Sequence, residues 1–192
     1  MRESDGAFLA MTDQGVYALM PSLVNGQLSY DWLRNKLLIP KEALDRTPAV
    51  DVAADEKQSY VLYDAGMRGD WKPELSQSLS AYSTDGTRRW TRLCELSFMI
   101  HLQPLGEGLI SVMHLDAQTG VYGPIEVLTA DGDTVFRLLL DTPGDCWGHS
   151  AVRADADTAY IGWVNVNKLT GLLTIKTAST SIDLAAALSP KN

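Results

Sequence analysis

Short apolar segments with a two-residue alternation recur along the whole chain, and most of them end in a turn rich in Gly, Asp or Asn. This alternation predicts half-buried β-strands, because successive side chains of a strand point to opposite faces of the sheet. Residues 33–46 interrupt the pattern: they are too short and broken for a long helix, so we predict a loop with one helical turn. The chain is therefore predicted to be all-β.

One sequence pattern occurs twice. Residues 83–90 and 129–136 both read hydroxyl-x-Asp-Gly-x-x-x-aromatic and lie 46 positions apart. A weaker copy with Asn-Gly occupies residues 25–30, and a degenerate copy without the glycine occupies residues 177–184. Self-similarity at a period in the forties indicates a repeat architecture. Asp-Gly and Asn-Gly also accept the positive φ angles of a tight primed turn, so each clear copy predicts a β-hairpin.

The turns divide the chain into four units of antiparallel strands, at residues 7–32, 47–94, 98–140 and 149–188. The last three units are predicted to hold four strands each, whereas the first begins at its second strand. The extra length of each unit lies between its second and third strands, as insertions in repeat proteins tend to do. These ranges predict about four four-stranded blades of a β-propeller, with the first blade incomplete.

The second unit also resembles the repeat of a known family. The likeness is carried by Pro48-Ala49-Val50, Tyr60-Val61, Leu79-Ser80-Ala81-Tyr82, Asp85-Gly86 and Trp90. In this order they resemble the blade repeat of pyrroloquinoline-quinone-type and WD-like β-propellers. The resemblance implies a β-propeller fold, either closed or part of a larger ring. Quinone enzymes of this fold typically have adjacent cysteines and a calcium site, whereas Cys94 and Cys146 lie far apart, so we expect no cofactor and no metal.

Composition and charge narrow the choice of partners. The formal net charge is −8, and the 16 Lys and Arg residues are scattered, which argues against nucleic acid. No apolar run approaches the roughly 18 residues of a membrane span. The first residues lack the features of a signal peptide, which leaves the compartment open. The two cysteines are equally open: they could form one disulfide or remain as buried thiols.

Acidic and aromatic residues are predicted to gather on one face of the propeller. The loops between second and third strands emerge beside the blade-to-blade connections, and they carry Asp70, Trp71, Tyr122, Asp145, Trp147 and His149. Loops on a rigid scaffold commonly carry function, and Tyr and Trp are enriched among binding hot spots. This set predicts a non-catalytic scaffold that binds a protein partner.

A hydrolase or transferase that uses His149 with Asp145 is the alternative, because the imidazole titrates near neutral pH. Propellers of the arylsulfotransferase type use a histidine from a similar loop. A third possibility is that both residues are structural. His149 would then cap the start of a blade, and Trp147 would fill the wedge between blades. An enzyme should place His149 within hydrogen-bonding reach of a carboxylate in a concave pocket.

The other titratable residues predict no chemistry. His101 and His114 fall within strands and have no carboxylate nearby in sequence, which favours core or surface positions. The carboxylate pairs Asp131 with Asp133 and Asp155 with Asp157 fall in turns, where Asp commonly bonds to the backbone.

The predicted strands fall one short of four complete blades. A propeller must close its ring, since an open end exposes an apolar sheet face to water. The tail could supply the missing strand, or a second copy or another chain could complete the ring. We favour the last two possibilities, so the expected partner is a protein or a second copy of this chain.

Overall fold

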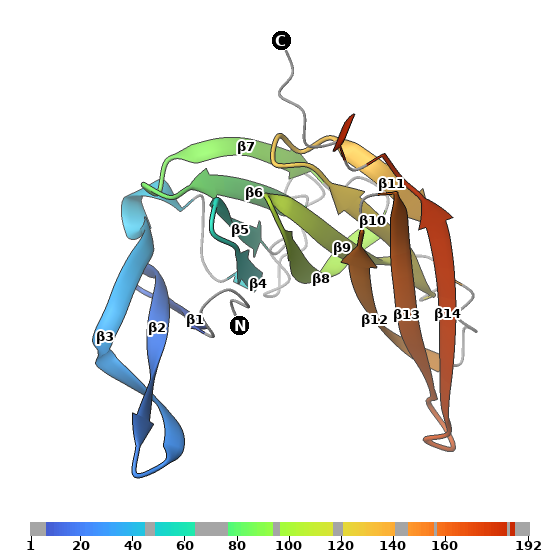
Figure 1. Cartoon of the computed structure of the whole chain (residues 1–192), viewed down its shortest axis with the longest axis horizontal. Helices are drawn as coiled ribbons and strands as arrows, with labels where there is room; N and C mark the ends of the chain where they lie inside the picture. Colours follow the sequence, from blue (N-terminus) through green and yellow to red (C-terminus); the bar gives the residue numbers. More distant parts are fainter. Residues whose placement is uncertain are drawn as a thin grey trace, which may run out of the picture. The chain divides into compact units, whose positions relative to one another are not determined.

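The computed structural model describes residues 7–44, 49–63, 77–93, 97–116, 121–140, 146–155, 157–183 and 185–186. Most of these residues lie in β-strands (Figure 1). The chain divides into two compact units, Met1–Leu93 and Cys94–Asn192, and each unit contains two antiparallel sheets. The predicted all-β class is confirmed.

The first unit begins with a three-stranded sheet and continues with a four-stranded one. The three-stranded sheet has the order β1 (Phe8–Thr12), β2 (Gly15–Val24), β3 (Gln27–Pro40), and a 3-10 turn, η1 (Lys41–Ala43), follows it. The four-stranded sheet has the order β4 (Ala49–Ala54), β5 (Gln58–Tyr63), β6 (Ser78–Ser83), β7 (Arg88–Leu93). Each strand pairs with the next one in sequence, so both sheets are meanders.

In the second unit the four-stranded sheet comes first along the chain and the three-stranded sheet follows it. Its four-stranded sheet joins β8 (Ser97–Gly106), β9 (Leu109–Asp116), β10 (Tyr122–Leu128) and β11 (Thr134–Leu138) in sequence order. Its three-stranded sheet joins β12 (Cys146–Ala154), β13 (Thr158–Asn167) and β14 (Leu173–Ser181). Four antiparallel sheets of three or four strands therefore make up the described part of the chain.

The loop predicted for residues 33–46 is wrong over most of its length. β3 continues to Pro40, because its last residues pair with the start of β2, from Gly15↔Pro40 to Leu19↔Asn35. Leu38 and Ile39 are buried by this pairing, so a non-local partner decides the conformation of the segment. The predicted helical turn is confined to η1.

The fourth sheet differs from the prediction as well. β14 runs unbroken from Leu173 to Ser181, and all nine of its residues pair with β13. The degenerate motif copy at residues 177–184 therefore begins inside a strand and contains no hairpin turn within the described residues. The predicted fourth strand of this unit is not among the strands that the structure describes, and the sheet has three.

The two Asp-Gly copies fold into the same hairpin. In each copy the N–H of the first residue, Ser83 or Thr129, donates to the carbonyl oxygen four residues later. The glycine N–H donates back to the carbonyl oxygen of that first residue. Both hairpins have a register shift at the matching position, between Ala81 and Tyr82 and between Val127 and Leu128. The 46-residue repeat is thus the hairpin of the third and fourth strands of a sheet.

The turns in the two Asp-Gly copies are not the tight primed turns that we predicted. Gly86 and Gly132 have φ angles of 82° and 86°, but among the described residues positive φ outside glycine occurs only at Asn25 and Glu107. The Asp-Gly copies are therefore three-residue loops with a bulge glycine rather than two-residue primed turns. Only the Asn25-Gly26 copy, with φ angles of 51° and 75°, is primed as predicted.

Hydrogen bonds to the Asp85 carboxylate predict a pH-dependent stability. The Ser83 hydroxyl donates to Asp85 Oδ1 at 2.5 Å and the Thr87 N–H donates at 2.9 Å, and these bonds lower the pKa of Asp85 from 3.8. A carboxyl group with a lowered folded pKa stabilises the fold above its unfolded pKa, and this contribution is lost as the pH falls through the folded pKa. Asp85→Asn should therefore flatten the fall in Tm below about pH 5, measured by circular dichroism.

The matched control is Asp131→Asn in the second copy of the turn. There the hydroxyl of Thr129 accepts the N–H groups of Asp131 and Asp133. The comparison shows whether a change in the acid slope depends on the bonds that Asp85 accepts or follows the loss of any carboxylate in this turn. Equal acid slopes for Asp85→Asn and wild type would show that the carboxylate contributes nothing to the turn.

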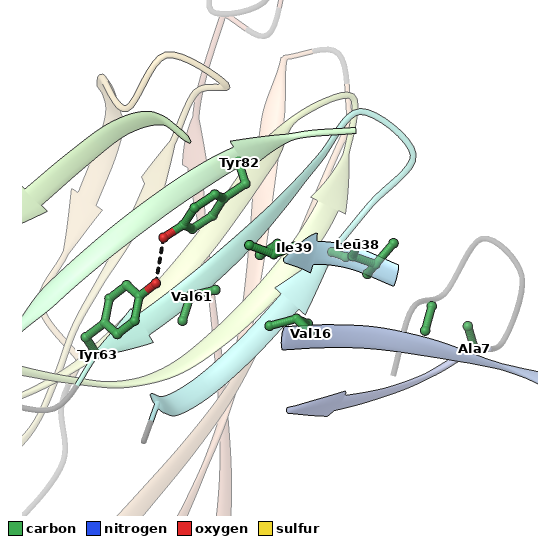
Figure 2. Packing of buried hydrophobic residues seen from close by; sticks show 9 residues of the cluster. Ala7, Val16, Leu38, Ile39, Val61, Tyr63 and Tyr82 are labelled. Atoms are coloured by element: carbon green, nitrogen blue, oxygen red, sulfur yellow. Dashed lines mark hydrogen bonds between the residues drawn. The ribbon is translucent and has the colours of Figure 1, made fainter. Parts of the chain in front are cut away.

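The two sheets of the first unit pack face to face. Val16, Ala18, Leu38 and Ile39 come from the three-stranded sheet, and Ala54, Val61, Tyr63 and Tyr82 come from the four-stranded sheet. Figure 2 shows the tyrosine pair, whose hydroxyl oxygens lie 2.5 Å apart inside this core. Each hydroxyl thus meets a polar partner where water is excluded, as buried polar groups require.

The second unit repeats this arrangement with different residues. Leu109, Met113, Ile125 and Val127 of the four-stranded sheet pack on Val152, Ala159, Ile161 and Trp163 of the three-stranded sheet. The Gln103 side chain joins the two sheets through bonds with the backbone of Val152, at 2.9 Å to its N–H and 3.1 Å to its carbonyl oxygen. Each unit is therefore a two-layer sandwich with its own core.

Candidate functional site

The structure describes only part of the predicted site. Asp70, Trp71 and Asp145 fall outside the described residues, as does Cys94. For Tyr122, Trp147 and His149 the structure gives the backbone. That backbone is strand rather than the predicted loop. Tyr122 pairs with Leu115. Trp147 pairs with Val166, and His149 pairs with Val164. The expected proximity of His149 to Asp145 stays a prediction.

A buried polar cluster lies in the four-stranded sheet of the second unit. His114 on β9 is 4% exposed and Glu126 on β10 is 2% exposed. Nε2 of His114 lies 3.3 Å from Oε2 of Glu126, and the Thr134 hydroxyl on β11 donates to Oε1 of Glu126 at 2.6 Å. Three neighbouring strands therefore bring a hydroxyl, a carboxylate and an imidazole into one hydrogen-bonded row.

The order of groups in this row does not suit nucleophilic catalysis. In a catalytic triad the imidazole lies between the hydroxyl and the carboxylate, so that it can take the hydroxyl proton. Here the carboxylate of Glu126 lies in the middle and accepts from the Thr134 hydroxyl. The cluster satisfies buried polar groups within a sheet, which is a structural role.

Glu126 is the residue that the sequence analysis missed. His114 was expected in the core or on the surface without a nearby carboxylate, and the structure confirms the core position but supplies the carboxylate from the next strand. His101, by contrast, is exposed. Glu126 could have been recognised from the register of β9 with β10, in which Met113 pairs with Ile125 and Val112 pairs with Glu126. This register brings Glu126 close to His114, which lies two residues after Val112.

A second buried polar cluster lies in the first unit. The Gln58 amide donates to the Tyr60 hydroxyl, and Arg89 donates to Oε1 of Gln58 at 2.8 Å. Burial raises the pKa of the Tyr60 hydroxyl above its ordinary value. The phenol therefore stays protonated at neutral pH, which suits a buried structural hydrogen bond and not a general base.

The three-stranded sheet of the second unit has one open face. Its other face packs on the core described above, but on this side Tyr160 is 49% exposed, Leu173 is 56% exposed and Ile175 is 70% exposed. The register places these residues on one face, because Tyr160 pairs with Ser179, Val164 with Ile175 and Val166 with Leu173. We call Tyr160, Gly162, Val164, Leu173 and Ile175 the β14 face.

A shallow hollow lies at one end of the β14 face, beside Tyr160 and Gly162. It has a volume of about 630 Å³, and its lining includes Ala151, Arg153, Tyr160, Gly162, Thr177 and Ser179. Gly162 forms its floor, since a Cβ atom added there would meet nothing within 4 Å. An apolar sheet face with such a hollow can accept a side chain from another surface.

The three-stranded sheet of the first unit has an open face too. Phe8 is 51% exposed and Leu37 is 44% exposed, and the register places them with Tyr17 and Leu19. We call Phe8, Tyr17, Leu19 and Leu37 the β1 face. The opposite side of the same sheet carries the residues of the first core. Each unit thus exposes one apolar sheet face.

The described residues show neither a metal-binding cluster nor a membrane-spanning helix. Within them, no group of three or more His, Cys, Asp or Glu side chains is placed to hold a metal ion. Nor does that part of the chain contain a helix long and apolar enough to cross a membrane.

Comparison with known proteins assigns no family: no protein-family model matches this chain, and no curated protein matches its sequence.

Proposed function

We propose that this chain is a non-catalytic scaffold of the β-propeller type that binds protein. The observation that carries the proposal is the pair of open apolar sheet faces, the β1 face and the β14 face. Contiguous exposed apolar surface of this kind is uncommon on a monomeric protein and typically marks an interaction site. Asp70, Trp71, Asp145, Tyr122, Trp147 and His149 are proposed as further contacts.

Three features support the propeller assignment. Every sheet is a meander of three or four antiparallel strands, which is the make-up of a propeller blade. The same bulged hairpin recurs at an interval of 46 residues in the two four-stranded sheets. The middle strands of those sheets are also buried along nearly their whole length, as the inner strands of a propeller blade are.

Affinity capture with matched variants tests protein binding. The tagged chain would be incubated with an extract of the cells that produce it, and the bound proteins would be quantified by mass spectrometry. We expect at least one protein, or an untagged copy of the chain itself, to be lost with Ile175→Glu and kept with Leu169→Glu. Leu169 is the matched control because it is 91% exposed but lies in the turn between β13 and β14.

Leu169→Glu and Ile175→Glu both replace an exposed aliphatic side chain with a carboxylate. Identical bound proteins for wild type, Leu169→Glu and Ile175→Glu would show that the β14 face binds nothing. The same experiment with Phe8→Lys examines the β1 face. If neither Ile175→Glu nor Phe8→Lys abolishes the binding of any protein, the proposed function has no support.

A further inference from the structure

β14 is a long edge strand with no neighbour on its outer side among the described strands. It has nine residues and pairs with β13 without a register shift, and the sheet order ends there. In the two four-stranded sheets a further strand occupies this position, because β7 follows β6 and β11 follows β10. The outer side of β14 (red in Figure 1) is therefore the place where the four-stranded sheets have their fourth strand.

Two hydrogen bonds show which backbone groups of β14 point to this open edge. The Asn167 N–H donates to the carbonyl oxygen of Leu172, and the Ile182 N–H donates to the carbonyl oxygen of Asp157, both at 2.9 Å. Along an antiparallel strand, residues that bond to the neighbouring strand alternate with residues that do not. The even-numbered residues of β14 therefore bond to β13. The N–H and C=O groups of the odd-numbered residues point to the open edge, and these residues are Leu173, Ile175, Thr177, Ser179 and Ser181.

Most other edge strands have features that hinder the addition of a further strand, such as charge, proline, short length or a bulge. β7 contains three arginines, and β1 and β11 have five residues each. β3 and β8 each contain a proline and two register shifts, and β4 contains Asp51 and one register shift. β14 has no proline and no register shift, and its one charged residue, Lys176, is partly buried. It thus lacks the protection that these other edges have.

The opposite edge of the same sheet, β12, is covered by a side chain. Oε1 of Gln103 accepts the N–H of Val152 at 2.9 Å, and Nε2 of Gln103 donates to the carbonyl oxygen of Val152 at 3.1 Å. Gln103 thus supplies the acceptor and the donor that a neighbouring strand would supply. The odd-numbered residues of β14 have no such cover within the described part of the chain.

We propose that the open edge of β14 binds an extended segment of a partner protein, which adds to this sheet as its fourth strand. The occupant is an extended segment because the edge offers alternating N–H and C=O groups at the spacing of a strand. Another extended backbone presents the matching groups at the same spacing. This inference rests on the proposed function, because it says how the scaffold holds the protein that it binds.

The side chains of β14 indicate the chemistry of that segment. The odd-numbered residues place Leu173 and Ile175 on the β14 face, and Thr177 and Ser179 line the hollow beside them. Aromatic and β-branched residues stabilise such cross-strand pairs. The segment should therefore have apolar residues at alternate positions, with a large one at the rim of the hollow.

Peptide binding with matched variants at Thr177 tests the inference. Peptides of twelve residues would be selected on the wild-type chain from a random phage-displayed library, then synthesised and measured by fluorescence anisotropy. Thr177→Pro removes an N–H that points outwards, a position at which edge strands tolerate proline. It should weaken peptide binding at least about tenfold, whereas Thr177→Val keeps the N–H and should bind as wild type does.

Methylation of the peptide backbone separates strand addition from binding through side chains. In an added strand, peptide N–H groups that face β14 alternate with N–H groups that face water. N-methylation of every second residue should therefore abolish binding in one frame and leave it in the other.

Hydrogen exchange provides the control for folding. In the free chain the amides of Ile175 and Thr177 should exchange quickly, whereas those of Lys176 and Ala178 should exchange slowly because they bond to β13. Bound peptide should slow the exchange at Ile175 and Thr177. Slow exchange at Lys176 and Ala178 in Thr177→Pro would show that this variant keeps the sheet.

Three outcomes would overturn the inference. The first is a selected peptide that binds Thr177→Pro as tightly as wild type; if Ile175→Glu still abolishes its binding, the proposed function stands and only strand addition fails. The second is a library that yields no peptide able to distinguish wild type from Thr177→Pro. The third is slow exchange of the Thr177 amide in the free chain, which would mean that another segment of this chain or a second copy already covers the edge.

Discussion

Replacing Glu126 with alanine should lower the free energy of unfolding by about 3 kcal/mol. The carboxylate is 2% exposed and accepts the Thr134 hydroxyl while lying 3.3 Å from the imidazole of His114. Its removal takes a hydrogen-bond partner from two groups in a buried sheet and leaves a cavity. Urea denaturation combined with hydrogen exchange of the β9 and β10 amides would measure the loss.

Two milder variants separate the contributions to this loss. Glu126→Gln keeps the size of the side chain and an acceptor for Thr134, so it should cost less than half as much as Glu126→Ala. Thr134→Val removes one hydroxyl and should cost about 1 kcal/mol. If Glu126→Ala were as stable as wild type, the cluster would have no structural role, and a functional role for His114 would have to be considered.

Gly86→Ala should destabilise the first unit by about 3 kcal/mol, for two reasons that add. The φ angle of 82° is unfavourable for a residue with a Cβ atom. That Cβ would also lie 2.7 Å from Cδ of Pro40 and 3.2 Å from the carbonyl oxygen of Leu38. The substitution therefore pushes the β6–β7 turn away from the end of β3, and Tm would fall accordingly.

Gly26→Ala is the matched control for this effect. Gly26 has a φ angle of 75°, but an added Cβ would meet nothing within 4 Å. The control should therefore cost only the conformational strain, about 1 kcal/mol. Equal losses for the two variants, measured by urea denaturation, would contradict the close packing of Gly86 against Pro40.

Local sequence patterns were sufficient for the strands that alternate and for the turns that join them. β5, β6 and β9 fall inside the units predicted at residues 47–94 and 98–140, because their alternation and flanking turn residues are local signals. The 46-residue repeat likewise has a local cause, since the same turn residues close the same bulged hairpin. The type of that turn was not predicted, because the hydroxyl and carboxylate bonds that favour the wider loop involve residues on both sides of the glycine.

The errors occurred where distant pairing decides the structure. The end of β3 lacks alternation at Leu37-Leu38-Ile39 and is followed by Pro40, yet pairing with Gly15 and Val16 makes it a strand. Glu126 and His114 are twelve positions apart, and only the register of β9 with β10 brings them together. The open faces were expected in outline from an incomplete ring, but their residues depend on register and burial that no local pattern encodes.

Site-specific photo-crosslinking would test most directly whether the β14 face is a protein-binding surface. The photoreactive residue p-benzoylphenylalanine would replace Ile175, and in a control chain it would replace Leu169; crosslinked products would be identified by mass spectrometry. We predict that position 175 forms a crosslink to another protein, whereas position 169 does not. Irradiation that leaves the chain labelled at position 175 without a crosslinked protein would contradict protein binding at this face.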